Sequence, residues 1–332
     1  MTRARGVADY GYYPPVNNNI LINPSFTVNQ RGDVTDHMNS TATFGPDRWE
    51  IRGIGQVGGT MSQSTTVIDP TTGVNKLLVK HRNATSETYI ITKVEAVDLQ
   101  GMYEKEMTFS FSYSDTGGSG IPKVIIYTYN GSGGASIIYE AIPTSLGNDR
   151  WTCTFTLSTD DGTIPDPSEA GLQVRLIANE GNTAPAEWKV WETKLEVGSV
   201  ATPFIARSYG EELLLCQRYY FMIADKRASS DKGNLIGTSF KYATSTETFT
   251  SLPVEMRATP TLETLFPGAN TLRILMAGKN IDTNVLTIDS DATSSMLRLA
   301  SSGINVADAP NGAGGWIRIN EAGGYVAADA EL

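Results

Sequence analysis

The chain has 332 residues, of which 40% are hydrophobic and 19% are charged, and its formal net charge is −10. This length exceeds what one hydrophobic core usually occupies, so we expect two domains. The negative charge argues against the positive field that draws proteins onto nucleic acid or anionic membranes. No apolar run approaches the roughly 20 residues of a membrane-spanning helix, so we expect no membrane insertion.

The first residues are not followed by an apolar segment that could form a signal peptide. We therefore expect synthesis and folding in the cytoplasm. There, Cys153 and Cys216 should remain two buried thiols rather than form a disulfide. The abundance of Gly, Ser and Thr, together with few charged residues, predicts a mainly β fold.

Residues 1–19 have too little regular apolar pattern to fold alone. They could be a flexible tail, or an extended docking peptide that becomes ordered when it binds another protein. The side chains suited to such docking are arginines and tyrosines: Arg3, Arg5, Tyr10, Tyr12 and Tyr13.

Strand patterns separated by turn sequences recur from residue 20 to about residue 200, which predicts a β-sandwich. The clearest is Met107–Tyr113, where odd positions are apolar and even positions are hydroxyls. This alternation predicts one buried face and one solvated face. Trp151–Leu157 repeats the pattern, so Trp151 and Cys153 should point inward. The spacing of such segments predicts about eight to ten strands.

Tyrosines of one predicted hairpin in this sandwich could bind a sugar. Tyr127, Tyr129 and Tyr139 can share one face by period-two alternation, and exposed aromatic rings stack on sugar faces. The opposite face carries Val124, Ile126 and Ile138, so either face could belong to the core. The three tyrosines could therefore be core residues instead.

A helix is predicted to begin at Ser208, because Ser208 followed by Glu211 forms a capping box ahead of an apolar cluster. The run Tyr219–Ile223 could continue this helix, but its aromatic and β-branched residues favour a strand. An isolated helix this short is marginal in water, and three copies could bury one another around an axis. The residues expected at this homotrimer contact are Leu213, Leu214, Cys216 and Tyr220.

Residues 225–332 show a charged loop followed by further strand patterns and no helix of ordinary length. They predict a second, smaller β-sandwich.

The sequence offers little support for catalysis. It contains only two histidines, His37 and His81, which leaves little room for a catalytic triad or a multi-histidine metal site. The neighbouring carboxylates at 160–161, 211–212 and 289–291 should diverge rather than face each other across a sugar, as a glycosidase requires. We expect no enzymatic activity.

Three parts of the chain resemble tailed-bacteriophage fibre and fibre-like virion proteins, and the resemblance covers residues 20–332. A connecting segment common in these proteins matches Glu196–Gly198, Ala201–Phe204, Arg207–Leu213 and Cys216–Tyr220. The start of their carbohydrate-binding-module-like jelly roll resembles Ile20–Gly32 with Asp47–Trp49, and their C-terminal β domain resembles Pro253–Thr261 and Gly324–Leu332.

This resemblance implies a virion structural protein, most simply a homotrimeric tail fibre made in the host cytoplasm. It would dock on another virion protein through its N-terminus and display β domains towards the host. Alternatives are a carbohydrate-binding module that recognises a host surface glycan, and a head-fibre or capsid decoration protein. The implied layout is a docking peptide (1–19), a jelly roll (20–207), a capped helix (208–224) and a C-terminal β domain (225–332).

Jelly rolls of this kind often hold a structural calcium ion between their first and last strands. The resemblance would place Asn23 and Glu192 there, and carboxylate and amide oxygens suit that ion. No other cofactor is implied.

Overall fold

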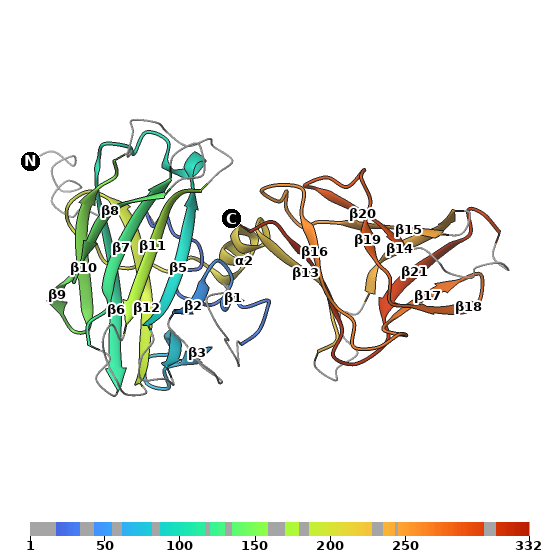
Figure 1. Cartoon of the computed structure of the whole chain (residues 1–332), viewed down its shortest axis with the longest axis horizontal. Coiled ribbons are helices and arrows are strands. Elements are labelled where there is room, and N and C mark those ends of the chain that lie inside the picture. The colour runs from blue at the N-terminus through green and yellow to red at the C-terminus, as the bar shows by residue number, and fades with distance from the viewer. Residues whose placement is uncertain are drawn as a thin grey trace, which may run out of the picture. The chain divides into compact units, whose positions relative to one another are not determined.

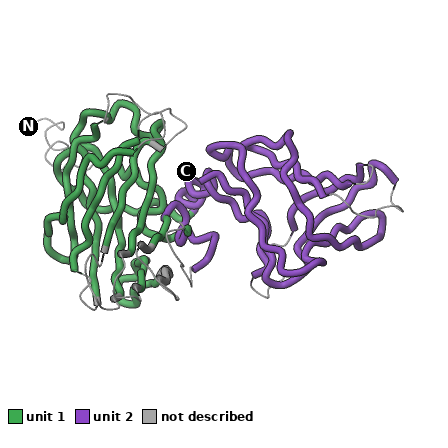
Figure 2. The backbone as a smooth tube through the Cα atoms, in the orientation of Figure 1, with its two compact units in different colours: residues 1–27, 34–43, 50–209 green, residues 28–33, 44–49, 210–332 purple. Residues whose placement is uncertain are grey.

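A computed structural model of the chain describes residues 18–33, 43–54, 62–81, 87–116, 120–129, 135–158, 170–178, 186–227, 235–242, 245–301 and 310–331. The described residues are mainly β, which confirms the predicted fold class (Figure 1). The chain forms two compact units. Unit 1 comprises residues 1–27, 34–43 and 50–209, and unit 2 comprises residues 28–33, 44–49 and 210–332 (Figure 2).

Unit 1 contains two six-stranded sheets that form a β-sandwich, with the orders β1-β2-β5-β11-β7-β8 and β3-β4-β12-β6-β10-β9. The strands are β1 (Thr43–Phe44), β2 (Glu50–Ile54), β3 (Ser62–Ile68), β4 (Asn75–His81), β5 (Glu87–Glu95), β6 (Glu106–Thr116), β7 (Lys123–Tyr129), β8 (Ala135–Ala141), β9 (Thr144–Gly147), β10 (Arg150–Thr156), β11 (Ala170–Ala178) and β12 (Ala186–Val197). A 3-10 helix, η1 (Ala96–Leu99), follows β5.

Strand β6 lies between β10 and β12 and supplies much of the sandwich core. Its Phe109 and Phe111 are fully buried, with ring centroids 5.3 Å apart. Trp151 and Cys153 of β10 lie opposite Phe111 and Phe109. Because directly opposed residues of antiparallel strands share a face, Trp151 and Cys153 point to the core side, as predicted.

The even positions of β6 contradict the prediction of a solvated face, because Thr108, Ser110 and Ser112 are also buried. The Arg150 guanidinium covers two of them, donating to the Ser110 hydroxyl at 2.7 Å and to the Ser112 hydroxyl at 3.4 Å. The Thr108 hydroxyl donates to the Gly198 carbonyl at 2.6 Å. These hydroxyls therefore face protein rather than solvent.

A buried ion pair on the same face fixes the segment that follows β12. The side chains of Lys194 and Glu196 are 2% and 1% exposed, and Nζ of Lys194 lies 3.2 Å from Oε2 of Glu196. Glu196 also accepts from the backbone N–H and the hydroxyl of Thr202, at 2.8 and 2.6 Å, and from the Asn18 amide at 2.7 Å. Lys194 donates to the Pro203 carbonyl at 3.1 Å. The motif residues Glu196, Thr202 and Pro203 are thus tied together through buried charges.

Helix α2 (Tyr209–Gln217) begins directly after Ser208, which confirms the predicted helix start. The following run forms strand β13 (Tyr220–Asp225), which confirms the preference for a strand. Cys153 and Cys216 are free, buried thiols, also as predicted.

Unit 2 has a three-stranded sheet, β13-β22-β16, and a seven-stranded sheet, β18-β17-β21-β14-β15-β20-β19. Leu272, Ile274, Leu299 and Ile317 are fully buried members of its core. The strands after β13 are β14 (Leu235–Tyr242), β15 (Ser245–Ser251), β16 (Thr261–Leu265), β17 (Leu272–Met276), β18 (Lys279–Thr283), β19 (Thr287–Ile288), β20 (Met296–Ser301), β21 (Gly314–Ile319) and β22 (Tyr325–Asp329).

The expected layout assigned residues 20–207 to one domain. In the structure, two short pieces of that range, residues 28–33 and 44–49, group with unit 2.

We predict that Glu196→Ala destabilises unit 1 by about 3–5 kcal/mol, because it leaves the buried Lys194 charge without its carboxylate. Chemical denaturation followed by tryptophan fluorescence measures this free energy of unfolding. Glu187→Ala on the same strand is the control, since the side chains of the Glu187–Lys80 pair are 44% and 35% exposed. That change should cost less than about 1 kcal/mol. Equal costs for the two variants would contradict the importance of the buried pair.

Candidate functional site

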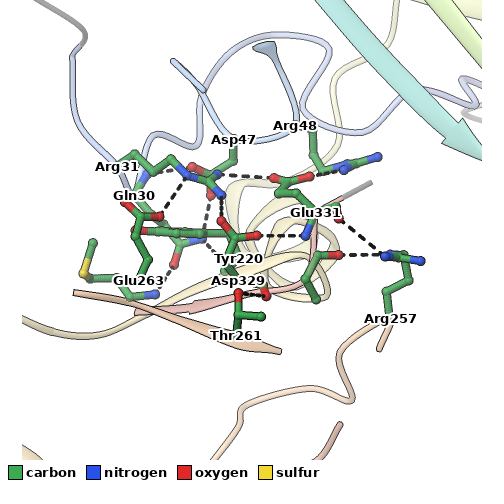
Figure 3. Close-up of polar contacts among 12 residues, drawn as sticks. Gln30, Arg31, Asp47, Arg48, Tyr220, Arg257, Thr261, Glu263, Asp329 and Glu331 are labelled. Atoms are coloured by element: carbon green, nitrogen blue, oxygen red, sulfur yellow. Dashed lines mark hydrogen bonds and ion pairs between the residues drawn. The ribbon is translucent and has the colours of Figure 1, made fainter. Parts of the chain in front are cut away.

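Two buried arginines of unit 2 pair with carboxylates at the end of the chain (Figure 3). Arg31, with a side chain 9% exposed, lies 3.1 Å from Asp329 and 3.2 Å from Glu331. Arg48, 3% exposed, forms an ion pair with the other oxygen of Glu331. We call these four residues, with Tyr219 and Tyr220, the arginine cluster.

Both guanidinium groups also lie over aromatic rings. Arg31 is 3.5 Å from the ring centroid of Tyr220, and Arg48 is 3.5 Å from that of Tyr219. Such contacts are worth about 2 kcal/mol or more when they are desolvated, and both tyrosines are buried. The ring of Tyr220, predicted at a trimer contact, therefore lies inside unit 2 against Arg31.

Asp47 and Gln30 extend the arginine cluster. The backbone N–H of Gln30 donates to Asp47 at 2.9 Å, and the Gln30 side-chain amide donates to the Tyr220 carbonyl at 2.7 Å. Burial raises the pKa of Asp47 to about 6. The motif residues at 30–31, 47–48 and 219–220 thus meet in one structural cluster that joins segments far apart in the sequence.

Two of the predicted sugar-binding tyrosines lie together on one face of a unit 1 sheet. Tyr127 is opposite Gln173, and Tyr129 follows two residues later on β7. The Arg175 guanidinium lies 4.1 Å from the Tyr127 ring centroid and donates to its hydroxyl at 3.1 Å. The Tyr129 hydroxyl is hydrogen-bonded to the Gln173 side chain. Both tyrosines are partly exposed, so their rings are held in place by polar partners.

The same face has an apolar base and fixed charges. Tyr127 packs against a small buried cluster of Tyr89, Ile91, Ile125 and Ile177. The Glu50 carboxylate, opposite Ile91, forms two ion pairs. One is with Nζ of Lys93 at 3.0 Å, and the other is with the Arg52 guanidinium at 2.7 Å. We call the side chains of Glu50, Arg52, Lys93, Tyr127, Tyr129, Gln173 and Arg175 the tyrosine face. Glu50 and Gln173 are themselves buried, so the exposed part of the face consists of the two tyrosine rings with the cationic side chains of Arg52, Lys93 and Arg175.

Tyr139 does not share the tyrosine face. A register shift between Ile126 and Tyr127 places Tyr139 opposite Ile126, because the additional residue at a β-bulge reverses the side-chain alternation. The Tyr139 ring lies 6.0 Å from that of Phe155 on the core side, and burial raises its pKa to about 12. Simple alternation along the sequence could not reveal this bulge.

The predicted trimer residues differ in exposure. Cys216 is fully buried, Leu213 is partly buried, and the Leu214 side chain is 50% exposed. Of the four residues assigned to this contact, Leu214 presents the most surface.

The two predicted calcium residues lie near each other in the fold. Asn23 is buried, and Thr193, next to Glu192, donates its backbone N–H to the Pro24 carbonyl at 3.0 Å. Glu192 lines a hollow together with Ser25. Among the described residues, no group of three or more His, Cys, Asp or Glu side chains could hold a metal ion. The available donors are thus one carboxylate with amide, hydroxyl and carbonyl oxygens, and calcium binding stays a prediction.

Several predicted residues lie outside the described part of the chain: Arg3, Arg5, Tyr10, Tyr12, Tyr13, His37, Asp160 and Asp161. Of the remaining carboxylates, Asp289 forms a turn by accepting the backbone N–H of Asp291 at 3.2 Å. Glu212 is buried in the first turn of α2. No helix within the described ranges is both long and apolar enough to cross a membrane.

No family model and no curated protein match the chain. Among solved structures, the enzymatically active domain of bacteriophage CBA120 tailspike protein 4 is similar at 10% identity and a TM-score of 0.34, covering 55% of this chain and 22% of that one. The CBM22-1 xylan-binding domain of Paenibacillus barcinonensis Xyn10C is similar at 11% identity and a TM-score of 0.29, covering 51% and 94%. The N-terminal cellulose-binding domain of Cellulomonas fimi β-1,4-glucanase C is similar at 12% identity and a TM-score of 0.30, covering 53% of this chain and 95% of that one. Similarity at this level assigns no function to the chain.

The raised pKa of Asp47 predicts a pH dependence of stability. Its ordinary value is 3.8, so its contribution to stability is fully present below that pH and is lost as the pH rises through about 6. The loss is on the order of 3 kcal/mol. Asp47→Asn should therefore flatten the decline in the free energy of unfolding of unit 2 between pH 4 and pH 7, measured by urea denaturation.

Asp291→Asn is the matched control for this change, because Asp291 is an exposed carboxylate of the same unit. It should leave the pH dependence close to that of the parent. An unaltered slope in Asp47→Asn would contradict the assignment.

Proposed function

We propose that the protein is a virion structural protein of the fibre type, and that unit 1 binds a host surface glycan through the tyrosine face. The observation that carries the glycan proposal is the fixing of Tyr127 and Tyr129 by Arg175 and Gln173 on the side away from the sandwich core. Localisation in the phage particle and docking through the N-terminal residues are parts of the same proposal, supported by the sequence resemblance.

The chemistry of the tyrosine face suits a sugar. Aromatic rings cover the C–H faces of a sugar ring, while guanidinium and ammonium groups beside them donate hydrogen bonds to its hydroxyls. Arg175 already holds Tyr127, so little side-chain freedom would be lost on binding. The sandwich core is filled from other positions, since Phe109, Phe111 and Trp188 are fully buried within it.

Self-association through α2 belongs to the proposal as well. Leu214 exposes half of its side chain, although it lies in a helix of only nine residues. Exposed apolar side chains on such a helix favour contact with other copies, because burial in an assembly would remove them from water.

Replacing the two tyrosines should abolish glycan binding by unit 1. We expect Tyr127→Ala combined with Tyr129→Ala to weaken binding at least tenfold, measured with the full chain on an array of bacterial surface polysaccharides. Tyr103→Ala, which removes a partly exposed tyrosine from the turn before β6, should bind like the parent. A double variant that binds every polysaccharide as strongly as the parent does would overturn the glycan role of this face.

A charge on α2 should dissociate the assembly. We expect Leu214→Asp to convert trimers to monomers in sedimentation velocity, because three carboxylates would be brought together at the contact. Leu235→Asp, a change at an exposed leucine of β14, should leave the trimer intact. A monomeric parent chain, or a trimer that persists in Leu214→Asp, would contradict self-association through α2.

A further inference from the structure

The seven-stranded sheet of unit 2 carries aromatic rings on the face opposite its core. Trp316 of β21 is 51% exposed, and Phe240 and Phe249 of the adjoining β14 and β15 are exposed as well. Thr238 is opposite both Trp316 and Phe249, so these side chains form one row across three strands. Phe240 and Phe249 contact each other edge to face, with centroids 6.3 Å apart.

A hollow of about 280 Å³ lies directly beside Trp316. Its other walls are Leu275, the hairpin between β17 and β18 with Asn280, and the backbone of Gly314 and Gly315. A Cβ atom at Gly315 would lie 2.2 Å from the Leu275 carbonyl oxygen, so only glycine fits here. The hollow therefore combines one aromatic wall with a peptide wall that carries no side chains.

Two arginines on this face are paired with carboxylates. Arg298, opposite Phe249, is 2.7 Å from Glu247, which is itself opposite Phe240. Arg273 of β17 binds Asp282 through two hydrogen bonds of 2.6 and 2.9 Å. Arg318, opposite Arg273, is a further cation on this face, and Lys279 also lines the hollow. The remaining charges are paired, and the hydrogen-bonding groups of the face are complementary to a hydroxyl-rich ligand.

This composition favours a saccharide over a second copy of the chain. The cores of protein–protein interfaces are depleted in charged residues, whereas Glu247 and Arg298 lie directly among the rings. A sugar needs the combination found here, an aromatic surface with hydrogen-bonding groups beside it. Adjacent strands are about 4.8 Å apart, so the row from Trp316 to Phe249 spans about 10 Å. A row of this length can contact more than one sugar residue.

We propose that unit 2 has a saccharide-binding site in which one sugar ring occupies the hollow against Trp316 and the chain continues over Phe240 and Phe249. Asn280 supplies hydrogen-bonding groups inside the hollow, and the glycines leave room for the sugar ring. The site lies wholly within unit 2 and does not depend on the tyrosine face of unit 1.

In the test, the full chain is titrated with each of three neutral probes, cellohexaose, maltohexaose and xylohexaose, and with the anionic probe hexagalacturonate. Calorimetry measures the binding in each titration. We expect the parent to bind at least one neutral probe, Trp316→Ala to weaken that binding at least tenfold, and Trp316→Phe to retain it within about threefold. The variant carrying Tyr127→Ala and Tyr129→Ala should keep this binding, which separates the site from that of unit 1. Circular dichroism and sedimentation of each variant accompany the titration.

Four results would overturn the proposal. They are binding of none of the neutral probes, binding of hexagalacturonate alone, undiminished binding in Trp316→Ala, and loss of the neutral binding in the tyrosine variant. A folded Trp316→Ala chain that binds like the parent but loses self-association would instead identify the face as an interface between copies.

Discussion

The burial of Arg31 and Arg48 is the constraint on which unit 2 depends. A charge removed from water is costly unless it is paired and hydrogen-bonded, so each guanidinium requires its carboxylate and its ring to be present together. Arg31 and its partner Glu331 are 300 residues apart in the sequence. Unit 2 therefore cannot complete its arginine cluster until both the early segments, 28–33 and 44–49, and the end of β22 are in place.

Unit 1 uses the same physical device in the pair of Lys194 and Glu196. In both units, residues of the short motifs named above hold buried charges: Glu196 in unit 1, and Arg31, Arg48 and Glu331 in unit 2. Neither cluster offers chemistry to a ligand, because its groups are engaged within the protein. The surfaces suited to binding lie elsewhere, at Tyr127 and Tyr129 in unit 1 and at Trp316 in unit 2. We thus separate the residues that maintain the fold from those that we propose bind glycans.

Local signals predicted local structure well. The capping box located the start of α2, and the aromatic, β-branched run located β13, because both depend on neighbouring residues. The covered face of β6 was missed, since Arg150 and the segment after β12 cover it from distant positions. Tyr139 was grouped with Tyr127 because no sequence pattern marks the bulge. For the hollow, the only local signal in the sequence is that Trp316 follows two glycines. The hollow itself becomes visible only when β21 pairs with β17.

Amide hydrogen exchange on the full chain tests most directly whether the arginine cluster makes unit 2 one cooperative body. The informative amides are those of Asp47, bonded to the Val28 carbonyl at 3.1 Å, and of Ala330, bonded to the Tyr219 carbonyl at 2.8 Å. If the cluster unites these segments, both amides exchange only through the same opening reaction, with one free energy that Arg48→Met lowers equally for both. Faster, independent exchange at Asp47, unaffected by Arg48→Met, would contradict this view of the protein.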